Sequence, residues 1–282
     1  MIDKIFICTS NDQALAAKIS KHSFDRHLNS DIDIEIIHNE KIPYLENIFQ
    51  KNYKRNNNIE VFNKDDMQSF TLARFYVPEL MNYDGIALVI DPDIFLVNEA
   101  RFLEHKSLNY DDFAIFCRKN INGNSWASSA MILNCKKLKH WSLKNIIENL
   151  IEFNSDYYEL INLINESANI FELPKSWNDF DNFDESSILL HLTQKDTQPW
   201  RVGLKLESYI PPIMGILPRA PIYKLLGRDL TIGRNHPNKE ITKLFLSLFS
   251  ECVSRNIISH DDINKNIDIG YLRTDIYELI QN

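Results

Sequence analysis

The chain has 282 residues, of which 44% are hydrophobic and 25% are charged, ordinary values for a globular protein. Its net charge of −8 argues against nucleic acid as a partner, because there is no basic surplus to neutralise phosphates. The four cysteines form no C-x-x-C pair, and no apolar run reaches the length of a membrane span. The first residues resemble a strand and not the apolar region of a signal peptide, so we expect no signal peptide. We therefore expect a cytoplasmic protein without a transmembrane segment or disulfides.

Apolar runs and turn residues predict alternating strands and helices over most of the chain. Strands are predicted at 3–8, 32–37, 86–90, 113–117, 130–134 and 186–193. Helices are predicted at 12–28, capped by Ser10, at 66–82 and within 139–166, and a loop is predicted at 51–58. This alternation indicates an α/β fold with a largely parallel sheet flanked by helices, in which ligands bind beyond the carboxyl ends of strands.

The pattern changes after residue 220. Apolar residues from Ile241 to Val253 recur at helical spacing. Ser259 and Asp262 resemble a capping box, and Thr274 is a candidate cap for a last helix. We therefore divide the chain into a domain at 1–220 and a helical C-terminal appendage at 221–282. The appendage is expected to pack on the core, with an interaction module as the alternative.

The most informative segment is an apolar strand that ends in Asp91, Pro92 and Asp93. Side chains at positions i and i+2 of an extended chain point to the same side, so the two carboxylates can converge. Pro92 lacks an N–H and ends the regular ladder. Two anions there suit a hard divalent cation that keeps open positions for phosphate oxygens, and a solvated acidic turn is the alternative. The seven glycines form no dinucleotide or P-loop motif. If a diphosphate binds, a metal ion must therefore make much of the contact with it.

Three motifs in order carry a family resemblance. Arg74 lies in a predicted helix seventeen residues before Asp91, a Tyr-Asp turn follows it, and His191 begins a later stretch that ends in Pro199-Trp200. Over roughly residues 1–205 the chain resembles the retaining GT-A glycosyltransferases of family 8, the glycogenin and galactosyltransferase-like group. The resemblance implies a Rossmann-like nucleotide-diphospho-sugar transferase fold. It also implies transfer of a sugar from a UDP-linked donor to an acceptor with retention.

The same resemblance assigns roles to residues. Asp91, Asp93 and His191 would hold Mn²⁺ or Mg²⁺, which acts as a Lewis acid on the leaving nucleoside diphosphate. Asp91, Asp93 and Arg74 would be catalytic, with Arg74 a fixed cation beside the donor; a surface helix residue is the alternative. Nucleotide contacts are expected from Thr9, Ser10, Asn11, Asp12, Arg74 and Lys195. Contacts to donor sugar or acceptor are expected from Ser128, Ser129, Trp177, Asn178, Asp181, Gln198 and Trp200.

The chain departs from the family pattern at two positions. Gln198 stands where a lysine precedes Pro-Trp, so Lys195 or Arg201 would supply the charge for the diphosphate. Ala127 stands where an asparagine is usual, and Ser128 or Ser129 would replace its hydrogen bonds.

The roles of two other residues stay open. Trp177 can stack on a sugar or belong to the core, and Asp156 is a candidate for the family's acidic/amide motif.

Two other functions stay open at this point. The departures at Ala127 and Gln198 are compatible with a nucleotide-sugar-binding protein that has no transfer activity. A nucleotidyltransferase would need a basic glycine-rich loop after the first strand, and Thr9-Ser10-Asn11-Asp12 is not such a loop. The donor sugar, the acceptor and the oligomeric state are not indicated by the sequence.

Overall fold

The computed structural model describes residues 1–28, 32–63, 68–206 and 231–280. The chain divides into two compact units. The first comprises Met1–Asp179 and Asp184–His191, and the second comprises Phe180–Phe183 and Leu192–Asn282. The predicted domain boundary between residues 220 and 221 lies outside the described residues.

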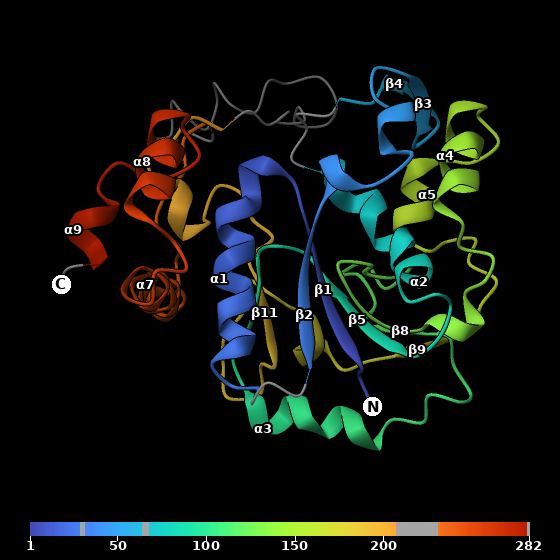
Figure 1. Ribbon diagram of the computed structural model, residues 1–282, viewed down its shortest axis with the longest axis horizontal. Coiled ribbons are helices and arrows are strands. Elements are labelled where there is room, and N and C mark those ends of the chain that lie inside the picture. The colour runs from blue at the N-terminus through green and yellow to red at the C-terminus, as the bar shows by residue number, and fades with distance from the viewer. Residues whose placement is uncertain (29–31, 64–67, 207–230, 281–282) are drawn as a thin grey trace. The chain divides into compact units, whose positions relative to one another are not determined.

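The first unit is built on a six-stranded sheet with the order β2-β1-β5-β8-β7-β9 (Figure 1). Its strands are β1 (Lys4–Thr9), β2 (Asp33–His38), β5 (Ile86–Ile90), β7 (Ile115–Cys117), β8 (Ala130–Asn134) and β9 (Ile170–Glu172). Three pairs, β1–β2, β1–β5 and β7–β9, are parallel, whereas β8 is antiparallel to both β5 and β7. The prediction of a mixed, largely parallel sheet flanked by helices is therefore confirmed.

The antiparallel strand β8 brings a second segment to the ligand edge of the sheet. Ile90, the last residue of β5, pairs with Ala130, the first residue of β8. The residues just before β8 therefore lie beside those just after β5, and Asp91 donates its backbone N–H to the carbonyl of Ser129 at 3.0 Å. A wholly parallel sheet would have placed the start of β8 at the opposite edge.

Helices and 3-10 turns cover the sheet and connect its strands. The α-helices of the first unit are α1 (Ala14–Asp25), α2 (Val77–Leu80), α3 (Glu99–Phe102), α4 (Leu143–Ile151) and α5 (Tyr157–Ile161). The 3-10 helices are η1 (Asn11–Gln13), η2 (Asn39–Lys41), η3 (Leu45–Asn47), η4 (Ser69–Tyr76), η5 (Leu103–Ser107), η6 (Cys135–Lys137) and η7 (Lys175–Asn178). The remaining strands are β3 (Asn52–Arg55), β4 (Asn58–Val61), β6 (Ile94–Leu96), β10 (Asp179–Phe180) and β11 (Leu189–His191).

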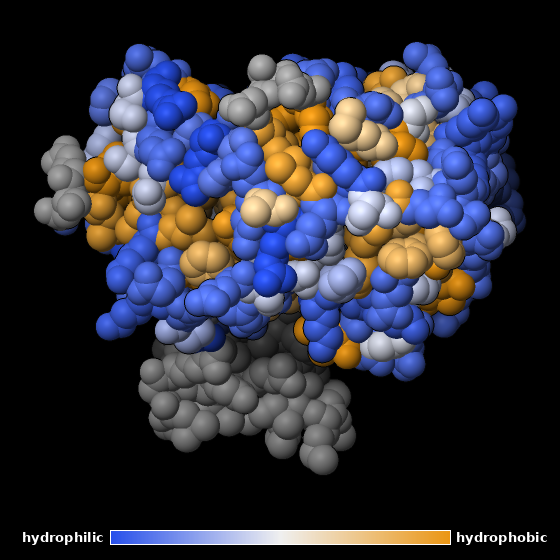
Figure 2. Space-filling view, turned by 90° about the horizontal axis from the view of Figure 1, so that it is seen from below, coloured by the Kyte–Doolittle hydropathy of each residue, from blue (hydrophilic) through white to orange (hydrophobic). Residues whose placement is uncertain are grey.

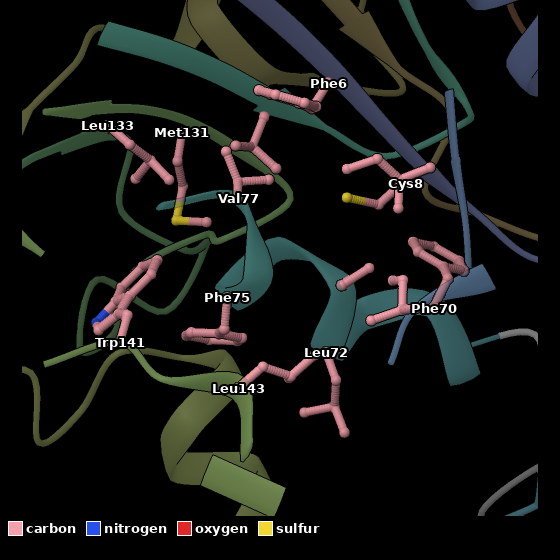
Figure 3. Packing of buried hydrophobic residues seen from close by; sticks show 14 of the residues in the cluster. Phe6, Cys8, Phe70, Leu72, Phe75, Val77, Met131, Leu133, Trp141 and Leu143 are labelled. Atoms are coloured by element: carbon pink, nitrogen blue, oxygen red, sulfur yellow. The ribbon is translucent and has the colours of Figure 1, made fainter. Parts of the chain in front are cut away.

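The sheet is buried on both faces. Along β1, Phe6 belongs to one hydrophobic cluster and Ile7 to the other, as the alternation of side chains in a strand requires. Figure 3 shows the first cluster, in which Phe75 of η4 packs against Trp141, with ring centroids 4.7 Å apart. Full burial of such a side chain contributes about 1.5–3 kcal/mol to the stability of the folded state. This packing fixes η4, which carries Arg74, against the sheet.

Three predicted elements differ in detail. Ser10 does not cap a helix: its hydroxyl donates to Asp12 at 2.5 Å, and α1 begins only after η1. The predicted loop at 51–58 is the hairpin β3–β4, whose turn residues Asn56 and Asn57 have φ of 50° and 63°. Paired left-handed residues match the twist of a hairpin, and asparagine tolerates that conformation.

The predicted helix at 66–82 is interrupted. Residues 66–67 lie outside the described part of the chain, and the remainder is η4 followed by the short helix α2, with Pro78 in its first turn. Proline has no N–H to complete a helical hydrogen bond and is tolerated in a first turn. A new helix therefore starts around Pro78 instead of continuing from η4.

The second unit contains α7 (Lys239–Ser254), α8 (His260–Asp268), α9 (Ile276–Ile280) and η8 (Pro199–Arg201). Trp200 packs against Phe245 of α7 with ring centroids 5.0 Å apart. The capping box of Ser259 and Asp262 is present at the start of α8, as predicted.

All four cysteines are buried and free. Within the described residues, no helix has both the length and the apolar character needed to cross a bilayer. On the face drawn in Figure 2, charged and polar side chains interrupt the apolar patches.

Candidate metal and nucleotide site

Two buried carboxylates follow strand β5. Asp91 and Asp93 are 6% and 8% exposed, and they lie in the tight connection between β5 and β6. The backbone N–H of Ile94 donates to the carbonyl of Asp91 at 3.3 Å, which closes the turn around Pro92. Burial makes a solvated acidic turn untenable, because buried carboxylates need charged or hydrogen-bonding partners.

His191 reaches these carboxylates through a second sheet, with the order β10-β11-β6. In its antiparallel register His191 pairs with Ile94, the residue that follows Asp93. The Nε2 atom of His191 consequently lies 3.3 Å from Oδ1 of Asp93. One ligand atom from each of Asp91, Asp93 and His191 lies within 4.8 Å of the other two. Two carboxylates and an imidazole at this separation can hold one divalent transition-metal ion.

Arg74 is buried against Asp91. Its Nε and Nη2 atoms donate to the two carboxylate oxygens at 2.9 and 2.6 Å, and its Nη1 donates to the hydroxyl of Ser128 at 2.7 Å. Arg74 is 5% exposed, so the surface alternative is wrong. This two-pronged contact fixes the plane of the Asp91 carboxylate. Each carboxylate oxygen keeps a further lone pair available for a cation.

Burial dominates the electrostatics of the site. It raises the pKa of Asp91 to about 6; Arg74 opposes the rise, the Asp93 charge adds to it, and His191 opposes it. Arg74 neutralises one of the two carboxylates when both are ionised, which leaves one net negative charge beside a neutral His191. A divalent cation would turn that charge into a net positive one, which suits a diphosphate.

Asn178 contacts the other nitrogen of the His191 ring. Its Oδ1 lies 2.8 Å from Nδ1 of His191, and its Nδ2 donates to the hydroxyl of Ser129 at 2.8 Å. Arg118 holds the backbone carbonyl of Asn178 through Nη1 at 2.7 Å. The amide of Asn178, 1% exposed, thus faces His191 directly.

The predicted nucleotide segment 9–12 lies at the same sheet edge. Ile7 pairs with Ile90, so the last residues of β1, which end at Thr9, run beside Asp91. The side chain of Thr9 is buried and donates to the carbonyl of Ser10 at 3.1 Å, while Asn11 donates to Glu40.

Sequence reasoning missed two buried polar residues at this edge. Asn39 follows β2, donates through Nδ2 to Ser69 at 2.8 Å, and its Oδ1 has no hydrogen-bond partner among the described residues. Arg118 follows β7. Both residues come directly after a strand, and this position in the sequence could have indicated that they lie at the ligand edge of the sheet.

Other predicted residues have mainly structural partners. Trp177 is 6% exposed and packs against Phe102 at 5.6 Å between ring centroids, so it belongs to the core. Asp156 accepts the backbone N–H groups of Asn56 and Asn57, both at 2.9 Å, and thereby anchors the β3–β4 turn.

Four predicted contact residues belong to the second unit. Asp181 accepts from the hydroxyl of Thr193. Gln198 donates to the carbonyl of Leu192 at 2.8 Å and accepts from Arg201 at 2.9 Å. Trp200 is 3% exposed, and Lys195 is partly buried. The structure therefore gathers Asp91, Asp93, His191, Arg74, Ser128, Ser129 and Asn178 into one cluster within the first unit.

No protein-family model and no curated protein matches this chain. Solved structures do match it. The glycosyltransferase GlyE from Streptococcus pneumoniae TIGR4 aligns at a TM-score of 0.52 and 13% identity, over 91% of this chain and 64% of GlyE. An active-site mutant of LgtC aligns at a TM-score of 0.50 and 9% identity, over 70% of this chain and 89% of LgtC. At such low identity the likeness establishes the fold, and this chain has the GT-A-like α/β fold of these glycosyltransferases.

Proposed function

We propose that this protein is a metal-dependent glycosyltransferase, which moves a sugar from a UDP-linked donor to an acceptor with retention at the anomeric carbon. The observation that carries the proposal is the convergence of Asp91, Asp93 and His191 beyond the carboxyl end of β5, in a fold shared with glycosyltransferases. In an α/β sheet this edge is where ligands bind. We expect the enzyme to act in the cytoplasm, which suits four free cysteines.

The donor atoms fit Mn²⁺ or Mg²⁺. Carboxylate oxygens are ligands for both ions, and the imidazole nitrogen favours Mn²⁺. A cation held by Asp91, Asp93 and His191 would supply Lewis acidity toward the leaving diphosphate. Arg74 holds the Asp91 carboxylate in one orientation, so that this ligand is organised before the donor arrives.

The nucleoside would lie beside the end of β1. The segment 9–12 supplies polar groups there, and the Oδ1 of Asn39, which no described residue contacts by a hydrogen bond, offers an acceptor at the end of the neighbouring strand β2. Lys195 is the candidate counter-charge for the diphosphate. Ser128 and Ser129, next to Arg74 and Asn178, are the candidate contacts for the donor sugar.

The direct test is a screen of nucleotide sugars for Mn²⁺-dependent turnover, followed by NMR of the fresh product. We expect cleavage of a UDP-sugar and, with an accepted acceptor, a product that keeps the anomeric configuration of the donor. A product with the inverted anomeric centre would contradict the retaining assignment.

A non-catalytic nucleotide-sugar-binding protein is the second candidate. It is favoured by Ala127, which cannot hydrogen-bond a sugar, and by Gln198, whose amide is engaged within its own unit. Mn²⁺-dependent binding of UDP-sugars without any turnover, either to an acceptor or to water, would select this alternative.

A further inference from the structure

Four side chains form a continuous series of polar contacts at the candidate metal site. It runs from the hydroxyl of Ser129 to the amide of Asn178, then to the two ring nitrogens of His191, and ends at Asp93. Successive atoms are 2.8, 2.8 and 3.3 Å apart. The amide and the ring are both buried, so water cannot substitute freely for either contact.

As the Asn178 amide is oriented in the structure, donors and acceptors follow one another in one direction along these contacts. Asn178 donates to Ser129, and its Oδ1 faces Nδ1 of His191, which must therefore carry the proton. The Nε2 lone pair of a neutral ring then points toward the Asp93 carboxylate, 3.3 Å away. Two lone pairs facing one another are repulsive unless a cation lies between them. This direction is thus the one that a bound metal requires.

The opposite direction satisfies every group equally well. A hydroxyl, a primary amide and a neutral imidazole can each exchange their donor and acceptor sides, and the amide does so by a half-turn that interchanges its oxygen and nitrogen. After reversal, Ser129 donates to Oδ1 of Asn178, Nδ2 of Asn178 donates to Nδ1 of His191, and Nε2–H of His191 donates to Asp93. The ring loses the proton on Nδ1 and gains one on Nε2, so the total number of protons is unchanged.

We infer that Asn178 is a positioning residue whose amide reverses when a divalent cation binds. In the metal-free protein His191 donates to Asp93, and in the loaded protein it presents its Nε2 lone pair to the ion. Neither state leaves a buried polar atom unpaired, which would be costly. The arrangement explains why a residue with both a donor and an acceptor stands behind His191. The inference rests on the proposed metal site and adds a mechanism by which this chain accommodates both states.

Nitrogen-15 NMR of the His191 ring at pH 8 tests the inference directly. The spectra compare protein treated with a chelator and protein saturated with diamagnetic Mg²⁺ and UDP, and the His191→Gln variant assigns the signals. We expect a protonated Nε2 without metal and a protonated Nδ1 with it, together with contacts of the Asn178 amide protons that move from His191 to Ser129. A ring that keeps the same protonated nitrogen throughout, or carries two protons without metal, overturns the inference.

Calorimetry on the same samples separates the two claims. If Mg²⁺ and UDP bind while the ring signals stay unchanged, the reversal is wrong and the metal site stands. If no metal binds under any condition, both are wrong.

Variants add a second readout. Asn178→Leu keeps the approximate volume and removes both hydrogen bonds, so we expect metal affinity to fall about 10–100-fold, as is typical for the partners of metal-bound histidines. Asn134→Leu is the matched control, since Asn134 is also a buried asparagine, donates to Tyr110 at 2.8 Å, and lies at the far end of β8. Equal metal affinity in the two folded variants would contradict the role of Asn178.

Discussion

Removal of Arg74 should make the stability of the protein depend on pH. In Arg74→Met, Asp91 loses two hydrogen bonds, at 2.9 and 2.6 Å, and the guanidinium charge that faces it, while it remains buried. Breaking a buried ion pair by removing one partner costs about 3–5 kcal/mol, because the remaining charge is uncompensated. Asp91 can avoid part of this cost only by taking up a proton.

The direction of the pH effect follows from the pKa values. Burial already raises the pKa of Asp91 to about 6 against a normal value of 3.8, and loss of Arg74, which opposes that rise, will raise it further. The folded state therefore binds a proton that the unfolded state releases at pH values between these limits. Stability from this group is present below about pH 4 and is lost as the pH rises through the folded-state pKa. We expect the variant to lose more stability at pH 8 than at pH 5.

Urea unfolding at both pH values measures the effect. Lys144→Met is the control, because Lys144 and Glu148 form an exposed pair at 3.9 Å that should contribute at most about 1 kcal/mol. The double variant Arg74→Met/Asp91→Asn should recover most of the stability lost by Arg74→Met. A loss below about 1 kcal/mol, or the same loss at both pH values, would refute this account of the Arg74–Asp91 pair.

Three further predictions address the metal, the hairpin and the phosphates. Mn²⁺ affinity measured by calorimetry should rise as the pH increases through about 6, because the cation needs Asp91 ionised; a flat profile from pH 5 to 8 would count against Asp91 as a ligand. Asp156→Ala should lower the free energy of unfolding by about 1–3 kcal/mol, since it leaves the N–H groups of Asn56 and Asn57 without their acceptor; an unchanged urea midpoint would show that the turn does not need this anchor. Lys195→Ala should weaken UDP more than uridine, by roughly 10–150-fold if one charge-assisted hydrogen bond is lost; equal weakening of both ligands would argue against a phosphate contact.

The features predictable from the sequence are those that local patterns encode. The apolar run before Asp91 specifies a buried strand and its end, and the spacing of Asp91 and Asp93 specifies their convergence. The hairpin was missed because Asn56 and Asn57 lie in a stretch, 51–58, that resembles a loop and in which every residue except Tyr53 is charged or an asparagine. Periodicity also carries no strand direction, so the antiparallel run of β8, which brings Ser128 and Ser129 to the site, could not be anticipated.

The features that escaped prediction depend on contacts between distant segments. Asn178 is ordinary in sequence, and its role emerges only because β11 brings His191 beside it. Trp177 could have been a sugar platform or core, and the packing of Phe102 decided for core. The alternatives for Arg74 were likewise resolved by the fold of η4 against the sheet.

The central claim is that a divalent cation held by Asp91, Asp93 and His191 couples this fold to a nucleoside diphosphate. Calorimetric titration of UDP with and without Mn²⁺ tests it in the wild-type protein, in Asp93→Asn, and in Asp111→Asn as an exposed control. We expect Mn²⁺-dependent binding in the wild type and the control, and a loss in Asp93→Asn greater than the roughly 10–100-fold typical of changes behind a ligand. Binding of UDP to Asp93→Asn with unchanged affinity and unchanged dependence on Mn²⁺ would contradict the claim.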